Sequence, residues 1–187
     1  MSELTAQPTI MILDACVLID YIKADRFVLE LAVKHVGRIC VPITIVNEVE
    51  DIEGPEDLQE LGIEIIEPEL EDTLEAASRK GSLSMQDWIC LLSAKRGGCV
   101  CVTSDKRLRR QCEEENVPVM WGLQILTKLA DSNWISAEGA MDVATKIHIL
   151  NPKFITDAIL RRLAVKLNVS YKPKSETSDQ SPNDGFD

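Results

Sequence analysis

Short apolar runs alternate with segments of helical spacing along the first 121 residues of the chain. The runs are nearly continuous in apolar residues, as strands buried on both faces are. They read PTIMILDA, RICVPITI, IEIIEP, CVCVTSD and PVMW, at residues 8–15, 38–45, 63–68, 99–105 and 118–121. Five buried strands are therefore expected.

The segments between these runs predict helices. Apolar residues recur three or four positions apart over 17–37, 46–52, 55–62, 69–80, 84–98 and 106–117. Ser84 is placed to cap the fifth of these helices and Gly97 to end it. Strands that alternate with helices predict an α/β fold of three layers, α/β/α, around a central parallel sheet of about five strands.

After Trp121 the strand pattern stops. Residues 122–134, 137–150 and 156–168 predict three C-terminal helices. The length of 187 residues suits one domain. We therefore expect a domain over 1–168, with an α/β core at 1–121 and a helical extension at 122–168. From Ser170 onward no aliphatic residue occurs, so residues 169–187 are expected to be a disordered tail.

The charge is uneven. The formal net charge is -11, yet thirteen Asp or Glu and no Lys or Arg lie between Glu48 and Glu75. The negative net charge argues against general affinity for nucleic acid but leaves room for a local basic groove.

Six cysteines without a C-x-x-C pair predict reduced thiols. The first apolar run contains Asp14 and Asp20 and follows no basic segment, which predicts a cytoplasmic protein without signal peptide or membrane span.

Four carboxylates are placed to meet at one end of the sheet. Asp14 and Asp105 end the first and fourth strands, Glu48 follows the second strand, and Asp87 lies in the first turn of a helix. Sites in open α/β sheets lie at the carboxyl ends of the strands, where the strand order reverses. Clustered carboxylates repel one another unless a cation is present. Hard oxygen ligands without His or thiolate favour Mg²⁺ or Mn²⁺.

Each of these residues also has a simpler explanation. Ser84 and Asp87 match a capping box, and Asp105 could be a plain helix N-cap. Glu48 could be a solvated residue of an acidic run. Asp14 is harder to explain in this way, because a charge within IMILDACVLI must be paired, bound to a ligand or at the very end of its strand. Asp20 is expected to point elsewhere.

Four segments in order resemble the acidic motifs of the PIN domain family: ILDACVLID, VPITIVNEV, LSMQDWICLLSAKRGG and VCVTSDKRL. The resemblance covers about residues 8–121. WGLQILTKLADSNWIS and NPKFITDAILRRLAV are similar to the tail of a prokaryotic PIN subgroup described as uncharacterised or toxin-like, which extends it to about 168. The family implies a parallel sheet of order 3-2-1-4-5. It also implies metal-dependent ribonuclease activity, as in the VapC-type toxins of toxin-antitoxin pairs.

The resemblance assigns roles to residues of this chain. The four acidic positions are implied to be catalytic and to bind Mg²⁺ or Mn²⁺, with two hydroxyls in support: Asp14, Glu48, Asp87 and Asp105, then Ser84 and Thr103. Ala15 and Cys16 depart from the pattern, since many active toxins carry a second hydroxyl there. Because Cys is a poor hydrogen-bond donor, we expect a supporting contact to be missing, with more effect on turnover than on metal binding.

The basic cluster after Asp105 suits an anionic polymer. Lys106, Arg107, Arg109 and Arg110 are expected to bind RNA phosphates, although a helix spreads them by about 100° per residue, so not all can point one way. A solvated helix face is the alternative for each of them.

The expected function is therefore that of a Mg²⁺- or Mn²⁺-dependent endoribonuclease, the toxin of a type II pair. The ion would polarise the scissile phosphate and activate a water, giving 5′-phosphate and 3′-hydroxyl products. The expected partners are RNA and a small antitoxin-like protein with a basic tail, and a homodimer is possible. The alternative is a PIN-like module that binds protein or RNA and cleaves nothing. A phosphoaspartyl phosphatase does not fit, because DACVLID lacks the second Asp two residues after the first.

Overall fold

Five parallel strands form one sheet in the order β3-β2-β1-β4-β5. The structure is a computed structural model and describes residues 9–172. The strands are β1 (Ile10–Leu13), β2 (Arg38–Pro42), β3 (Glu64–Ile66), β4 (Val100–Val102) and β5 (Val119–Met120). The predicted fold class and the expected strand order are confirmed.

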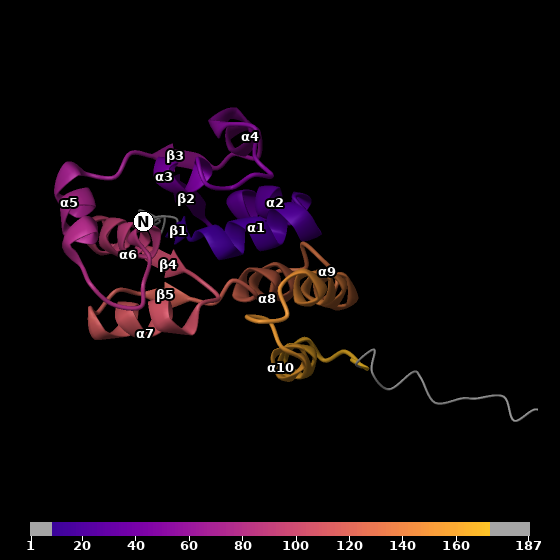
Figure 1. Cartoon of the computed structure of the whole chain (residues 1–187). Coiled ribbons are helices and arrows are strands. Elements are labelled where there is room, and N and C mark those ends of the chain that lie inside the picture. Colours follow the sequence, from indigo (N-terminus) through magenta and orange to yellow (C-terminus); the bar gives the residue numbers. More distant parts are fainter. Residues whose placement is uncertain (1–8, 173–187) are drawn as a thin grey trace, which may run out of the picture.

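Helices cover both faces of the sheet (Figure 1). One side carries α1 (Ala15–Ala24) and α2 (Phe27–His35), with α8 (Gln124–Asp131) and α9 (Ala137–Leu150) packed on them. The other side carries α5 (Leu70–Ser78), α6 (Met85–Gly97) and α7 (Lys106–Glu114). The short helices α3 (Ile43–Val46) and α4 (Pro55–Glu60) lie by β2 and β3, and α10 (Asp157–Leu167) packs on α8 and α9.

The core lies between the sheet and these two helix layers. Every residue of β1 from Met11 to Leu13 is buried, as are Ile39 to Pro42 of β2 and both Cys101 and Val102 of β4. Central parallel strands bury both faces, which explains the continuous apolar runs in the sequence.

The helix expected over 17–37 is in fact two helices, α1 and α2. Asp25 is extended, and its Oδ1 accepts the N–H of Phe27 at 3.1 Å. A short acidic side chain that bonds a nearby backbone N–H competes with helix continuation, and here the chain breaks. Apolar residues keep their helical spacing across this break, so the sequence pattern does not indicate that one helix ends and another begins.

The second strand is shorter than predicted. β2 ends at Pro42, and Ile43–Val46 forms α3 instead of continuing the strand. The helix predicted over 46–52 is a series of turns. Proline has no backbone N–H to donate, which favours the end of a strand over its interior. In α6 the helix runs through Gly97, and the left-handed C-cap is Gly98, with φ of 61°.

Residues just past 168 contact the fold. Val169 and Tyr171 pack against the core, and the Tyr171 hydroxyl donates to Oδ1 of Asp157 at 2.7 Å. The first residues of the predicted tail are therefore in contact with the domain. The rest of that tail, 173–187, lies outside the described residues.

The cysteines are free thiols, as expected: Cys16 is half-buried, and Cys40, Cys90, Cys99, Cys101 and Cys112 are buried. From residue 9 to residue 172, the chain forms no helix with the length and apolar character needed to cross a membrane.

Candidate functional site

Asp14 and Asp105 lie at the carboxyl ends of neighbouring strands. Leu13 pairs with Val102 in the β1–β4 register, and the N–H of Asp14 donates to the Val102 carbonyl at 3.1 Å. Asp14 therefore stands beside Thr103, two residues before Asp105. β1 and β4 also adjoin at the point where the strand order reverses, which is where the sequence placed the site.

Asp14 is a buried carboxylate at the first turn of α1. Its Oδ1 caps the helix by accepting the Val17 N–H at 2.9 Å. Burial raises the pKa of Asp14 to about 6, although hydrogen bonds from Thr103, Val17 and Cys16 oppose the rise, and the charge of Asp87 adds to it. A carboxylate that titrates near neutral pH in this position is suited to binding a cation or a proton.

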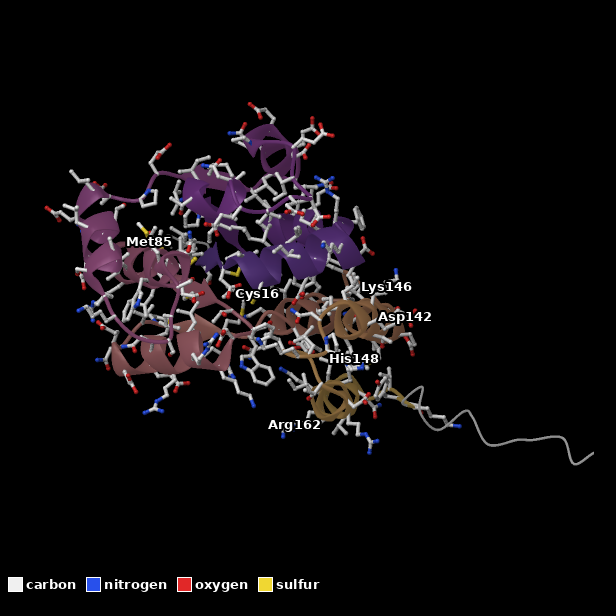
Figure 2. All side chains as sticks on the ribbon, viewed as in Figure 1. Cys16, Met85, Asp142, Lys146, His148 and Arg162 are labelled. Atoms are coloured by element: carbon white, nitrogen blue, oxygen red, sulfur yellow. The ribbon has the colours of Figure 1, made fainter. Side chains whose placement is uncertain are left out.

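Cys16 contacts the same carboxylate. Its Sγ lies 3.2 Å from both carboxylate oxygens of Asp14, and Figure 2 shows Cys16 near the start of α1. Burial raises the pKa of the Cys16 thiol well above its usual range, and the charge of Asp14 raises it further, so the thiol stays protonated and donates. The supporting contact expected to be missing is present, although its donor is weak.

Asp105 is the N-cap of α7 and also forms an ion pair. Its Oδ1 accepts the Arg107 N–H at 2.6 Å, and its Oδ2 lies 3.1 Å from Nη2 of Arg107. The Asp105 N–H donates to Oγ1 of Thr103 at 3.0 Å. Burial opposes ionisation of Asp105, but the hydrogen bonds and charge of Arg107 outweigh it, so the pKa of Asp105 is lowered. Asp105 is thus ionised and already has a cationic partner.

Asp87 reaches this end of the sheet from the first turn of α6, and Glu48 from the turn that follows α3. Ser84 and Asp87 form a complete capping box, with the Ser84 N–H to Oδ2 of Asp87 at 2.8 Å and the Asp87 N–H to Oγ of Ser84 at 3.1 Å. The amide of Gln86 donates to Oε1 of Glu48. The charge of Asp87 affects the pKa values of both Asp14 and Arg107, which places it close to both.

The four predicted carboxylates therefore share one end of the sheet, but they do not form a tight cluster. Within 9–172, no three Asp, Glu, His or Cys side chains stand close enough together to hold a metal ion between them. The donor set itself suits Mg²⁺ or Mn²⁺, because it is made of carboxylate oxygens with hydroxyl support. An ion bound by these residues would compete with Arg107 for Asp105.

The basic cluster points in several directions, as helical spacing predicts. Arg107 pairs with Asp105, and Arg110 pairs with Glu114 of its own helix at 2.9 Å. The guanidinium of Arg109 stacks over the Trp121 ring, with its carbon 4.3 Å from the ring centroid. Lys106 is exposed and lines a hollow that also contains Asp105. Of the four cations, Arg107 is the one in direct contact with a predicted site carboxylate.

The sequence predicts only that Asp20 points elsewhere. In the structure Asp20 is also a buried carboxylate, which was not predicted. Its Oδ1 accepts a hydrogen bond from Nδ2 of Asn151 at 2.9 Å. Burial raises the pKa of Asp20 to about 7, the Asn151 hydrogen bond opposes this, and the charge of Asp14 adds to it. The signal was present in VLIDYI, where a charge interrupts an apolar run as it does at Asp14.

Comparisons with known proteins place the chain in no known family. No family model matches it, and no curated protein gives a significant match. A solved structure described as "a domain of a functionally unknown protein from Methanocaldococcus jannaschii DSM 2661" is similar at 20% sequence identity with a TM-score of 0.40. The likeness covers 60% of this chain and 90% of that one.

Proposed function

We propose that this protein is a Mg²⁺- or Mn²⁺-dependent endoribonuclease of the PIN type. The observation that carries the proposal is the position of Asp14 and Asp105 at the ends of the adjacent strands β1 and β4, with Asp87 in the N-terminal turn of α6 near enough for its charge to act on Asp14. Asp14 is buried without a cationic partner in the described structure, which is costly for its charged form and favours a bound cation.

The roles of the residues follow from their positions. Asp14 and Asp105 would hold the cation, with Asp87 and Glu48 beside it. A bound cation would supply charge stabilisation of the scissile phosphate and would make a nearby water more acidic. One carboxylate of the set takes the proton of the attacking water. Arg107, once released from Asp105, is placed to bind a phosphate oxygen.

The deciding experiment is cleavage of a labelled single-stranded RNA with and without Mn²⁺. The wild-type protein should cleave only with metal, and Asp14→Asn should abolish cleavage. Asn is an equally good helix N-cap, so this variant keeps the fold of α1 while losing the charge. Asp142→Asn, an exposed carboxylate on α9 shown in Figure 2, is the matched control and should cleave normally. Metal-dependent cleavage that survives Asp14→Asn would contradict the assignment.

Metal binding can be tested separately from cleavage. A ligand that binds only the folded state raises the melting temperature by mass action. Mn²⁺ should therefore stabilise the wild-type protein and leave Asp14→Asn and Asp105→Asn unchanged. A melting curve that does not respond to Mn²⁺ or to chelator, together with no heat of binding, would reject the four-carboxylate site.

One observation favours a second candidate function. The ion pair between Arg107 and Asp105 already neutralises one of the four carboxylates. A protein that binds no metal and cleaves nothing could keep this pair permanently. A PIN-like binding module would bind RNA or protein with the same affinity in the presence of chelator and would show no cleavage with any divalent metal.

We infer in addition a partner with a basic tail, of the kind that holds a toxin inactive. A hollow of about 320 Å³ beside Glu48 is lined by Glu50 and Glu53. Within the described chain neither of these two carboxylates forms a salt bridge, whereas their neighbour Asp51 pairs with Lys23 at 3.0 Å. An arginine or lysine side chain would complement this hollow.

A further inference from the structure

A cavity of about 420 Å³ lies between α7 and α10, beyond the end of β5. Its walls include the apolar side chains of Val119, Leu123, Ile159 and Leu163. Three basic residues and one acidic residue of two helices also line it: Arg109, Arg162 and Lys166, with Glu113. This volume falls in the range of cavities that hold small organic groups. An apolar interior with cationic walls suits a flat ring that carries a negative group.

The cavity lies near the candidate site. A second hollow of about 300 Å³ is lined by Asp105, Lys106 and Phe154. Between the two lies a small hollow of about 10 Å³, which shares Lys106 and Phe154 with one and Arg109 and Trp121 with the other. We call this run the extension groove and define it by Lys106, Arg109, Trp121, Phe154, Arg162 and Lys166.

Three cations of this groove form no salt bridge in the described part of the chain, although Glu113 lies in the same cavity wall as Arg109. Over residues 9–172, none of the side chains of Lys106, Arg162 and Lys166 forms a salt bridge. By contrast, the basic residues near the acidic segment 48–75 are paired with it: Lys23, Arg26, Arg38, Arg79 and Arg96. A chain with a net charge of -11 thus keeps a row of unpaired cations in one groove, which favours an anionic ligand.

Aromatic rings alternate with these cations. Arg109 stacks over Trp121, and the amino group of Lys153 lies 5.3 Å from the Phe154 ring centroid. Nε of Arg109 and Nε1 of Trp121 are buried without a hydrogen-bond acceptor, so both donors are left unsatisfied at this wall of the cavity. A positive groove with interleaved aromatic rings is the combination that binds single-stranded nucleic acid, phosphates on the cations and bases on the rings.

We propose that the extension groove binds single-stranded RNA and leads it to Asp105. The proposal rests on the proposed function, because it assigns the helical extension as the substrate-binding element of that same site. It also gives the helical extension a role in binding, in addition to its packing on α1 and α2. One strand would run from α10 past Trp121 and Phe154 to the end of β4.

The test measures binding without cleavage. A fluorescent single-stranded RNA of about 12 nucleotides, within the usual site size, is titrated with protein in chelator, and anisotropy is followed at several salt concentrations. Arg162→Gln with Lys166→Gln should weaken binding about tenfold or more and lower the salt slope by about 1.4. Phe154→Leu should also weaken binding at unchanged salt slope, because it removes a stacking surface and no charge.

The matched control removes two cations elsewhere. Lys128→Gln with Lys146→Gln, on exposed positions of α8 and α9, should bind RNA like the wild type; Figure 2 shows Lys146 on α9 and Arg162 on α10. Equal losses in both double variants would mean that charge alone matters, and the groove assignment would be rejected. No binding by the wild type, or stronger binding of polyglutamate than of RNA, would reject it as well.

The two proposals fail in different ways. If RNA binds in the groove but Mn²⁺ never produces cleavage, the nuclease proposal fails and the groove remains. If the wild type cleaves RNA and the Arg162 and Lys166 double variant binds and cleaves equally well, the nuclease proposal remains and the groove assignment is wrong.

Discussion

At the scale of single residues, Asp14 takes part in three interactions at once. Its N–H completes the β1–β4 ladder, its carboxylate caps α1, and the same carboxylate faces Thr103 and Cys16. Burial of this charge opposes folding, and the caps and hydrogen bonds offset part of that cost. Substitutions of Asp14 therefore affect stability and site chemistry together, and Asn separates them best.

Cys16 offers a test of how the carboxylate is tuned. A serine hydroxyl is a stronger donor than a thiol, so Cys16→Ser should lower the pKa of Asp14 from about 6 and keep it ionised to lower pH. The pH below which Mn²⁺ affinity falls should move down by about half a unit. Cys16→Ala, which removes the donor, should move it up. Calorimetric titrations with Mn²⁺ between pH 5 and 8 measure this, and identical profiles for all three proteins would show that the thiol has no influence.

Asp20 should make the protein less stable as the pH rises. Its pKa is raised to about 7 by burial, so the folded state holds a proton that the unfolded chain has already lost above its usual pKa. The stability it contributes is full below the unfolded pKa and is lost as the pH rises through 7. Asp20→Asn should therefore gain about 2 kcal/mol relative to the wild type between pH 5 and pH 8.

Urea unfolding at the two pH values measures this difference, with Asp131→Asn as the control at an exposed position of α8. Asp20→Asn keeps an oxygen that can accept the Asn151 hydrogen bond, so the comparison isolates the charge. A gain that is the same at both pH values would mean that Asp20 is not protonated in the folded state.

At the scale of elements, the helices with clear end signals were predicted most closely. Ser84 starts α6 as expected, and α9 covers the predicted residues 137–150. The break between α1 and α2 was missed, because apolar spacing continues through it and the deciding contact is the local bond from Phe27 to Asp25. The turn into α3 was missed for a similar reason, since RICVPITI is apolar on both sides of Pro42.

An ion pair with one buried partner joins α5 to α6. The guanidinium of Arg96, itself 46% exposed, donates to both carboxylate oxygens of Asp72, at 2.9 and 2.7 Å, and the Asp72 side chain is only 7% exposed. Arg96→Gln would leave that carboxylate buried without a cation and should lower the free energy of unfolding. Chemical denaturation of the two proteins measures the loss.

The control is Arg110→Gln, whose partner Glu114 and own side chain are 50% and 81% exposed, and it should cost less than about 0.5 kcal/mol. Adding Asp72→Asn to Arg96→Gln should recover part of the loss, because the unpaired charge is then gone. If Arg96→Gln costs no more than Arg110→Gln, the pair does not fasten α5.

At the scale of the whole molecule, charge is divided between two regions. The acidic segment 48–75 contains α4 and most of α5, and its carboxylates form ion pairs with most of the nearby basic residues. The extension groove lies on the opposite part of the fold, with unpaired cations. The position of the four carboxylates at one sheet end was predictable from strand order. The groove was not, because Trp121, Phe154 and Arg162 meet only through the packing of α10.

The acidic hollow by Glu48 should steer a basic partner. Glu50→Gln with Glu53→Gln should slow association of that partner several-fold at low salt and leave Mn²⁺ binding unchanged, because opposite charges speed encounter and salt screens them. Stopped-flow association with the partner isolated from the native host measures the rate. Asp142→Asn is the control. An association rate that is independent of salt and of these substitutions would show that the acidic segment steers no partner and affects solubility alone.

The contact between Asp105 and Arg107 makes metal and RNA cooperative ligands under the proposed function. Oδ2 of Asp105 and Nη2 of Arg107 lie 3.1 Å apart, so each side chain occupies the group with which the other would bind its ligand. A cation that takes Asp105 frees Arg107 for a phosphate, and a phosphate that takes Arg107 frees Asp105 for a cation. Because linkage is reciprocal, Mn²⁺ should tighten RNA binding by the same factor by which RNA tightens Mn²⁺ binding. Arg107→Gln would remove this part of the coupling, and any coupling that remains would report direct attraction between the cation and the phosphate.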